Sequence, residues 1–258
     1  HWYGGAGTPA IYAFEWSYDG AGNRVGEVRN GVTTQYEYDA ANELRKAHDA
    51  TSAQTTYFEY DPNGNCRKTV AAAGTTYFAY DSRDLQTRIT FRTGITNYFR
   101  YDALGRRTAL VDSAGAAYFT YDADGLCHPV EYDAAGAVTA RHTRGISPVP
   151  GIGDLLASKV ERNGTAYFQY PAYDPRGNVH RLVNEAGIVT GYFEYDAWGR
   201  YLRNTPPPEG TRFGPSAPAW IILRDDPDNL FSITPTRTAH RGVGRFLQRD
   251  VLFATNRY

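Results

Sequence analysis

Residues 101–107 read Tyr-Asp-Ala-Leu-Gly-Arg-Arg, and residues 60–65 read Tyr-Asp-Pro-Asn-Gly-Asn. Both stretches place a Gly three residues after the Asp of a Tyr-Asp pair. This pair recurs along the chain with successive steps of 20, 22, 20, 21, 20, 11, 41 and 22 residues. The step of 41 is close to two periods, and the step of 11 is an extra half-length unit. A period near 21 residues, sustained over most of the chain, identifies an internal repeat.

The conserved feature of each repeat is a Tyr, an Asp and, in most repeats, a Gly at the third position after the Asp. These residues are Tyr18, Asp19, Gly22, Tyr38, Asp39, Tyr60, Asp61, Gly64, Tyr80, Asp81, Tyr101, Asp102, Gly105, Tyr121, Asp122, Gly125, Tyr132, Asp133, Gly136, Tyr173, Asp174, Gly177, Tyr195, Asp196 and Gly199. Asn42 and Asp84 stand in the two positions without Gly, and Asn and Asp tolerate positive φ best among the other residues. We therefore expect the leading Asp to accept backbone N–H bonds in a turn that a left-handed residue closes.

Strands are expected on both sides of each turn. An aromatic residue lies two positions before most of the repeat tyrosines, at Trp16, Tyr36, Phe58, Phe78, Phe99, Phe119 and Phe193. The residue between the two is usually polar, and a further Tyr often precedes, so the period of two predicts a strand with one aromatic face. Phe168 and Tyr170 are assigned to the same kind of pair, with Pro171 in place of the Asp.

Each repeat is thus predicted to be a β-hairpin of about 20 residues. A single hairpin is marginally stable in water and needs neighbours that continue the sheet. The expected fold class is all-β, with repetitive antiparallel β-hairpins forming a continuous, curved or spiralling sheet. The repeat array is predicted over residues 1–203, a Pro-rich crossover over 204–229 and a separate segment over 230–258.

A loop and a tight turn are also predicted outside the regular repeat. The segment that begins at residue 147 is expected to be a loop, in which Asp154–Lys159 could form one helical turn. Asn163-Gly164-Thr165 is an N-glycosylation sequon, so Asn163 is a possible glycosylation site. The same Asn-Gly pair is the strongest hairpin signal among dipeptides, and a turn is sufficient to explain it.

Composition narrows the function classes. The chain carries 27 Lys and Arg against 28 Asp and Glu, and this balance disfavours a surface for nucleic-acid phosphates or anionic lipids. No run of 18 apolar residues predicts a membrane span. Two cysteines, Cys66 and Cys127, make no disulfide framework, and the disulfide state of the pair is left open. No metal site and no cofactor is expected, because the histidines lack ligand spacing and the repeated aspartates are better explained as turn residues.

The residues at 60–65 and 101–107 resemble the consensus of the YD-repeat, or Rhs (rearrangement hot spot), family. The resemblance covers residues 14 to 203. It implies a sheet that spirals into a hollow shell, as in bacterial polymorphic toxins, toxin-complex subunits, wall-associated proteins and animal teneurins. The shell of this family typically encloses a toxic C-terminal domain.

Residues 244–250, Gly-Arg-Phe-Leu-Gln-Arg-Asp, resemble the motif of the Rhs-associated core, with Val251 in place of the expected Pro. In the family an Arg, the Asp of this motif and a second Asp further on resemble an aspartic autoprotease, and the first two map by position to Arg237 and Asp250. The second Asp is expected beyond Tyr258. Since such a site needs two close carboxylates, the resemblance implies an incomplete protease, and no catalytic residue is assigned here.

The favoured function is therefore a non-enzymatic structural scaffold, either a wall segment of a hollow shell or a self-assembling extracellular filament or tube. The alternatives are a fragment of a polymorphic-toxin shell with an autoproteolytic core, and a cell-surface carbohydrate-binding protein. Expected partners are further copies joined through open sheet edges, or the remainder of a longer Rhs chain and its toxin cargo, with no nucleic acid. The expected location is secreted or at a bacterial cell surface. The start at His1 without Met is expected for a processed product or an excised piece.

Overall fold

The computed structural model describes residues 2–3, 10–121, 129–145, 155–174, 177–209, 221–222, 225–234 and 236–248. The predicted repeat residues Asp122 and Gly125, and also Cys127 and Asp250, lie outside these ranges. The chain divides into two compact units, His1–Phe78 and Ala79–Tyr258. Within the described residues every regular element is a β-strand, and no helix has the length and apolar character needed to span a membrane.

The first unit is a series of antiparallel hairpins. Each strand from β3 to β8 pairs with the next, β8 pairs with β9, and β1 pairs with β2. The unit boundary falls inside β9. The strands are β1 Trp2–Tyr3, β2 Ala10–Tyr12, β3 Phe14–Tyr18, β4 Arg24–Arg29, β5 Val32–Tyr38, β6 Leu44–Asp49, β7 Gln54–Tyr60, β8 Cys66–Ala71 and β9 Gly74–Tyr80.

The second unit continues the same pattern and adds a small sheet. Each strand from β10 to β20 pairs antiparallel with the next. These strands are β10 Gln86–Thr90, β11 Thr96–Tyr101, β12 Arg107–Asp112, β13 Gly115–Thr120, β14 Val130–Tyr132, β15 Val138–Arg144, β16 Leu155–Arg162, β17 Thr165–Tyr173, β18 Val179–Val183, β19 Val189–Tyr195 and β20 Tyr201–Thr205. The predicted all-β fold of repeated antiparallel hairpins is confirmed.

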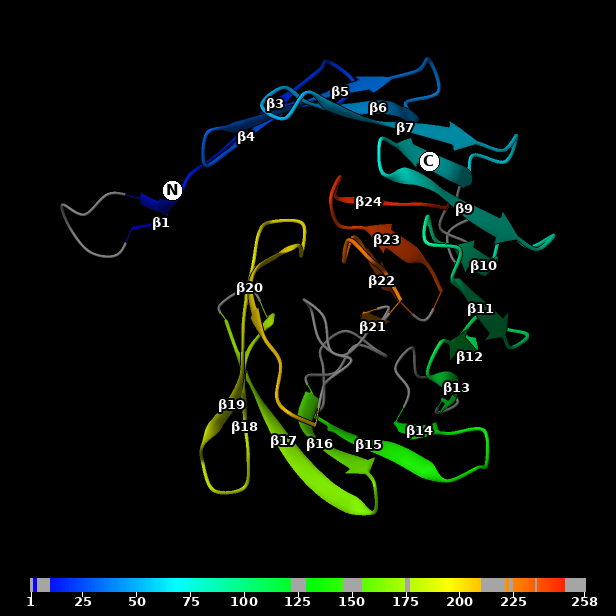
Figure 1. Cartoon of the computed structure of the whole chain (residues 1–258), viewed down its shortest axis with the longest axis vertical. Helices are drawn as coiled ribbons and strands as arrows, with labels where there is room; N and C mark the ends of the chain where they lie inside the picture. Colours follow the sequence, from blue (N-terminus) through cyan, green and yellow to red (C-terminus); the bar gives the residue numbers. More distant parts are fainter. Residues whose placement is uncertain are drawn as a thin grey trace. The chain divides into compact units, whose positions relative to one another are not determined.

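The small sheet, here called the C-terminal sheet, has the strand order β21-β22-β23-β24. Its strands are β21 Ile221–Ile222, β22 Phe231–Ile233, β23 Thr238–His240 and β24 Arg245–Phe246. In the second unit, β10 to β20 follow an arc, and the C-terminal sheet lies on the inner side of that arc (Figure 1).

The aromatic residues two positions before the repeat tyrosines lie on the inner face of the strands. Six of the seven are at most 6% exposed, and burial of each contributes about 1.5–3 kcal/mol. They are Tyr36, Phe58, Phe78, Phe99, Phe119 and Phe193. Trp16, in the first repeat, is 38% exposed and departs from the pattern.

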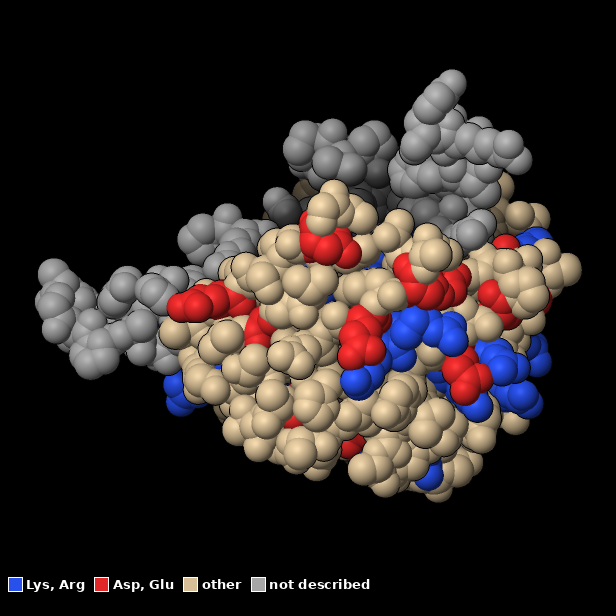
Figure 2. Space-filling view, turned by 90° about the horizontal axis from the view of Figure 1, so that it is seen from above, with Lys and Arg blue, Asp and Glu red and all other residues tan. Residues whose placement is uncertain are grey.

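The opposite face of the strands carries tyrosines and mixed charges. Tyr57 and Tyr77 of the first unit and Tyr98 of the second unit are about half exposed. On the outer face of the first unit, Lys46 Nζ lies 2.7 Å from Glu37 Oε1, and Lys68 Nζ lies 2.9 Å from Glu59 Oε1. Figure 2 shows basic and acidic side chains beside one another on the face that it presents. Neither sign forms an extended patch there.

Two local predictions are wrong. Phe168 and Tyr170 do not form an inward-facing pair, because Gln169 between them faces inward instead. The turn begins at Tyr173-Asp174, and alternation back along the strand from Tyr173 places Gln169 on the inner face. Gln169 is fully buried, whereas Tyr170 is 40% exposed. The helical turn expected over Asp154–Lys159 is also absent from its described part, since Leu155–Arg162 forms β16, held between β15 and β17.

Candidate functional site

The described Tyr-Asp repeats close with one common turn. In the repeat at Asp102, the carboxylate Oδ1 accepts hydrogen bonds from the backbone N–H of Leu104 at 2.9 Å and of Arg106 at 2.8 Å. The N–H of Gly105 also donates to the carbonyl of Asp102 at 3.1 Å. The same bond from the N–H four residues later is made to Asp19, Asp39, Asp61, Asp81, Asp133, Asp174 and Asp196.

The third residue after each Asp adopts the left-handed conformation. The repeat glycines in the described ranges have φ between 77° and 85°, and Asn42 and Asp84 both have φ of 60°. Two of the other turns in the described residues share these backbone hydrogen bonds, lack the Tyr-Asp pair and were not predicted. One starts at Asn184, whose Oδ1 accepts the N–H of Ile188 at 2.9 Å, and the other starts at Phe91. The sequence signal for both was a Gly at the same offset, at Gly187 and Gly94.

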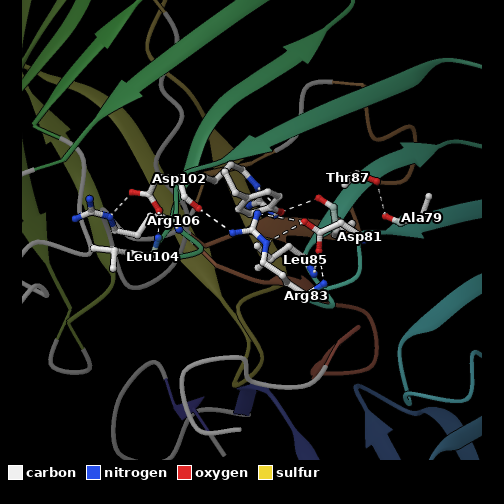
Figure 3. Close-up of polar contacts among 11 residues, drawn as sticks. Ala79, Asp81, Arg83, Leu85, Thr87, Asp102, Leu104 and Arg106 are labelled. Carbon is white, nitrogen blue, oxygen red and sulfur yellow. Dashed lines mark hydrogen bonds and ion pairs between the residues drawn. The ribbon is translucent and has the colours of Figure 1, made fainter. Parts of the chain in front are cut away.

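Consecutive turns are linked to one another. Arg83 pairs with Asp81 in its own turn, and its Nη1 donates to the carbonyl of Asp102 in the next turn at 3.1 Å (Figure 3). Arg106 Nε donates to Asp102 Oδ2 at 2.7 Å, and together with the backbone bonds it holds the pKa of that carboxyl below its usual value, against the effect of partial burial. Side chains therefore connect neighbouring repeats along the edge formed by the turns.

The repeat tyrosines make a second link between neighbours. The hydroxyl of Tyr101 donates to the carbonyl of Gln86 at 2.7 Å, and that of Tyr121 donates to the carbonyl of Arg107 at 2.6 Å. Tyr38 and Tyr173 make equivalent bonds to Arg24 and Leu155. Phe lacks this hydroxyl, which explains why this position of the repeat is Tyr, whereas the inner aromatic position varies.

The C-terminal sheet is attached to the inner face of the second unit by a buried arginine. Arg107 is 1% exposed, and its Nη1 donates to the carbonyl of Thr234 at 2.6 Å. Its Nη2 donates to the hydroxyl of Tyr101 at 2.8 Å, and its guanidinium stacks 4.4 Å from the centre of the Phe99 ring. Burying a cation costs free energy unless its hydrogen-bond donors are satisfied. The contacts of Arg107 are made only when the C-terminal sheet lies in this position, so they fix how the sheet docks.

Further contacts attach the same sheet at other points. Thr238 Oγ1 donates to Gln86 Oε1 at 2.6 Å, and Arg92 makes two bonds to Asp228 at 2.8 and 2.9 Å. The backbone N–H of Ser113 donates to Asp225 at 2.8 Å. Sequence reasoning missed all of these contacts, because they join residues more than 100 positions apart.

Of the two residues that resemble a protease site, the structure describes Arg237 but not Asp250. The guanidinium carbon of Arg237 lies 3.6 Å from the centre of the Phe246 ring, and its backbone N–H donates to Thr234 Oγ1 at 2.9 Å. Asp250 lies outside the described residues, so the pairing of Arg237 with Asp250 stays a prediction.

Asn163 and Gly164, with φ of 49° and 75°, form the two-residue turn between β16 and β17. Cys66 is fully buried, which raises the pKa of its thiol to about 12.

The C-terminal sheet has two buried titratable groups, Asp226 in the connection between β21 and β22 and His240 in β23. Burial raises the pKa of Asp226 to about 6, although the backbone N–H groups of Phe231 and Asp228 partly oppose the rise. Burial lowers the pKa of His240 to about 4. Neither residue was singled out from the sequence.

A polar cluster occupies the inner face of β14 to β17. His142 Nδ1 lies 2.8 Å from Ser158 Oγ, and His142 Nε2 lies 3.2 Å from Glu131 Oε1. Gln169, opposite Ser158 in the neighbouring strand, donates to Glu209 Oε1 at 2.9 Å. A cavity of about 700 Å³ is lined by Glu131, His142, Gln169 and Glu209 among others. Within the described ranges, no group of three or more His, Cys, Asp or Glu residues converges to hold a metal ion.

These features define a repeat protein whose hairpins build a sheet by nearest-neighbour addition. A family model described as Teneurin YD-shell matches residues 8–139, just over half of the chain. The chain belongs to this YD-shell family.

Three of the further similarities each cover only a small part of a much longer protein. The tRNA3(Ser)-specific nuclease WapA of Bacillus spizizenii is 30% identical over 191 residues, which are 72% of this chain and 7% of that protein. The crystal structure of TcdB2-TccC3-TEV matches 95% of this chain at 14% identity and a TM-score of 0.46, and the match covers 16% of the solved chain. The structure of the Photorhabdus luminescens Tc holotoxin pore matches at 12% identity and a TM-score of 0.33, over 95% of this chain and 18% of its own.

The turn at Asp19 allows a matched test of the left-handed position. Gly22 has φ of 83° and Gly20 is outside the left-handed region, and an added Cβ meets no atom within 4 Å at either position. We expect Gly22→Ala to lower the free energy of unfolding by about 1–2 kcal/mol. Gly20→Ala should leave it unchanged or raise it by up to about 1 kcal/mol. Urea denaturation measures both, and equal effects of the two substitutions would contradict the turn assignment.

The attachment of the C-terminal sheet can be tested at Arg107. We expect Arg107→Met to make residues 221–248 sensitive to limited proteolysis, because the bonds to Thr234 and Tyr101 are lost. Far-ultraviolet circular dichroism should still report a β-sheet. Arg88→Met is the control, since Arg88 lies exposed on β10, which β11 separates from the strand of Arg107. The same cleavage pattern in both variants would rule out the proposed attachment.

Asp226 and His240 make opposite contributions to stability between pH 4 and 6. Because His240 stays neutral in the folded state, the folding stability of the chain falls as the pH drops from 6.5 to 4, where only the unfolded state takes up the proton. Asp226 has the reverse effect, because the folded state holds its proton up to about pH 6. Over this range Asp226→Asn should lose more stability on acidification than the parent chain, by up to about 3 kcal/mol. Parallel stability–pH curves from denaturant titrations would show that Asp226 does not titrate as stated.

Proposed function

We propose that the chain is a segment of the wall of a hollow protein shell, with a structural rather than an enzymatic role. The observation that carries this proposal is the inner face of the second unit, which covers another part of the same polypeptide. Arg107, Arg92 and Ser113 on the arc hold the C-terminal sheet against that face. A sheet whose repeats share a buried aromatic residue on the inner side is suited to enclosing polypeptide.

The repeat geometry supports this role physically. Every hairpin gains its stability from its neighbours, so a wall can be extended by adding repeats, and its length sets the enclosed volume. Membership of the YD-shell family supports the same role. The remainder of a longer chain and an enclosed cargo polypeptide are the proposed partners, and the proposed location is secreted or at a bacterial cell surface. The proposal keeps the division into 1–203, 204–229 and 230–258.

Specific observations also support two alternative functions. Copies of the chain can join edge to edge into a filament or tube, because the sheet grows by backbone hydrogen bonding between hairpins. The half-exposed Tyr57 and Tyr77 of the first unit favour a carbohydrate-binding surface as a further alternative, since exposed aromatic rings stack on sugars. Binding of the folded chain to a glycan array tests that alternative.

Electron microscopy of the native particle, combined with intact mass, tests the shell proposal. We expect a closed hollow particle built from a chain much heavier than 28.7 kDa. Filaments or rings of 28.7 kDa subunits would replace the shell by a self-assembling scaffold, and a monodisperse open monomer would contradict both.

The same mass measurement addresses the toxin-shell alternative with an autoproteolytic core. If Arg237 and Asp250 belong to such a core, the full-length parent releases its C-terminal part, and Asp250→Asn in that parent leaves one uncut chain. Unaltered processing of the Asp250→Asn parent would exclude the assignment of Asp250.

A further inference from the structure

The inner face of β14 to β17 carries buried polar side chains that contact one another. They come from four neighbouring strands: Glu131 of β14, His142 of β15, Ser158 of β16 and Gln169 of β17. All four are at most 8% exposed, and Ser158 and Gln169 are completely buried. Burying such side chains costs free energy unless each is hydrogen-bonded. The buried carboxylate of Glu131 is therefore a departure from apolar packing of the kind expected at functional sites.

The cluster includes two carboxylates, Glu131 and Glu209, that are each held by a buried polar side chain. His142 bridges Ser158 and Glu131, with 2.8 Å to the hydroxyl and 3.2 Å to the carboxylate. Gln169 holds Glu209 at 2.9 Å. Because Ser158 and Gln169 are directly paired in neighbouring strands, the two halves form one polar row across the sheet.

Both fixed carboxylates face the cavity of about 700 Å³. The cavity is also lined by Asp133, Glu161 and Arg162, but Asp133 accepts the backbone N–H groups of its own turn, and Glu161 pairs with Lys159 at 2.5 Å. The lining therefore has an excess of negative charge.

The wall of the cavity also includes aromatic rings. Phe193 and Tyr201 line it, with their ring centres 6.1 Å apart. Carboxylates together with aromatic rings are the groups that bind organic cations. A metal ion fits poorly, since no described set of three or more ligand side chains converges.

We propose that this cavity binds a cationic nitrogen group, an ammonium or guanidinium, between Glu131 and Glu209. The group can belong to a free amine or to a lysine or arginine side chain of an enclosed polypeptide. His142 and Gln169 act as positioning residues, because each orients one carboxylate. The binding chemistry is a property of this chain and does not depend on whether a complete shell forms.

Calorimetric titration of the whole chain with n-butylguanidinium tests the proposal, and n-butylurea serves as the uncharged probe of similar shape. We expect saturable binding of the cation and none of the urea. Glu131→Gln combined with Glu209→Gln keeps the size of both side chains and should weaken binding at least tenfold. Glu185→Gln, which removes an exposed carboxylate in the turn at Asn184, is the matched control and should bind like the parent chain.

A second measurement separates loss of the site from loss of folding. Nitrogen-15 signals of the imidazole of His142 should shift on addition of n-butylguanidinium, because the ligand competes for the carboxylate that His142 contacts. If the double variant fails to fold, the single Glu209→Gln variant is used, since Glu209 follows β20 and is not part of a strand. Equal affinity in all variants, or equal binding of n-butylurea, would overturn the proposal.

The source of the cation is distinguished by two further probes. Spermidine represents a free polyamine, and a blocked pentapeptide with one central Arg between glycines represents a polypeptide side chain. Tighter binding of spermidine than of the peptide identifies a free amine, and the reverse identifies an enclosed chain. Failure of both to bind would overturn the two proposed sources of the cation, even if n-butylguanidinium binds.

Discussion

The hydrogen bonds from two backbone N–H groups to a single Asp carboxylate are the interaction on which the rest of the structure depends. In each described repeat this carboxylate closes the turn with the N–H groups that follow it, and a left-handed residue completes the reversal. Since side chains alternate along a strand, the position of the turn also decides which residues face inward. β17 shows this directly, because the turn at Asp174 places Gln169 inside and Tyr170 outside.

Bonds between neighbours then convert single hairpins into a wall. The tyrosine hydroxyls reach the carbonyl of the preceding repeat, and Arg83 connects two successive turns. The wall of the second unit is specialised on its inner side in two places. Between β10 and β13 it holds the C-terminal sheet through Arg107, Arg92 and Ser113, and between β14 and β17 it carries the polar row.

The sequence was informative wherever the structure is determined locally. The turn residues, the hairpins, the two faces of the strands and the all-β fold follow from spacings of two to four residues, and even the replacements Asn42 and Asp84 obey the conformational requirement. Local reasoning failed at Phe168–Tyr170, where two overlapping aromatic pairs competed, and at Leu155–Arg162, where pairing with two neighbours produced a strand. The cavity was beyond such reasoning, because strand register alone brings Glu131, His142 and Ser158 together.

The tyrosine bond has a consequence for how such a chain can change during evolution. Most of these bonds span only 14 or 15 residues and point to the repeat immediately before, so a whole hairpin carries its own means of attachment. Gene duplication or recombination between similar repeats can therefore insert or remove a unit without redesigning its neighbours. Residues 86–113 are exempt from that freedom, since they also hold a sheet more than 100 positions away. Lineages are thus expected to differ in the number of repeats elsewhere while they retain this stretch intact.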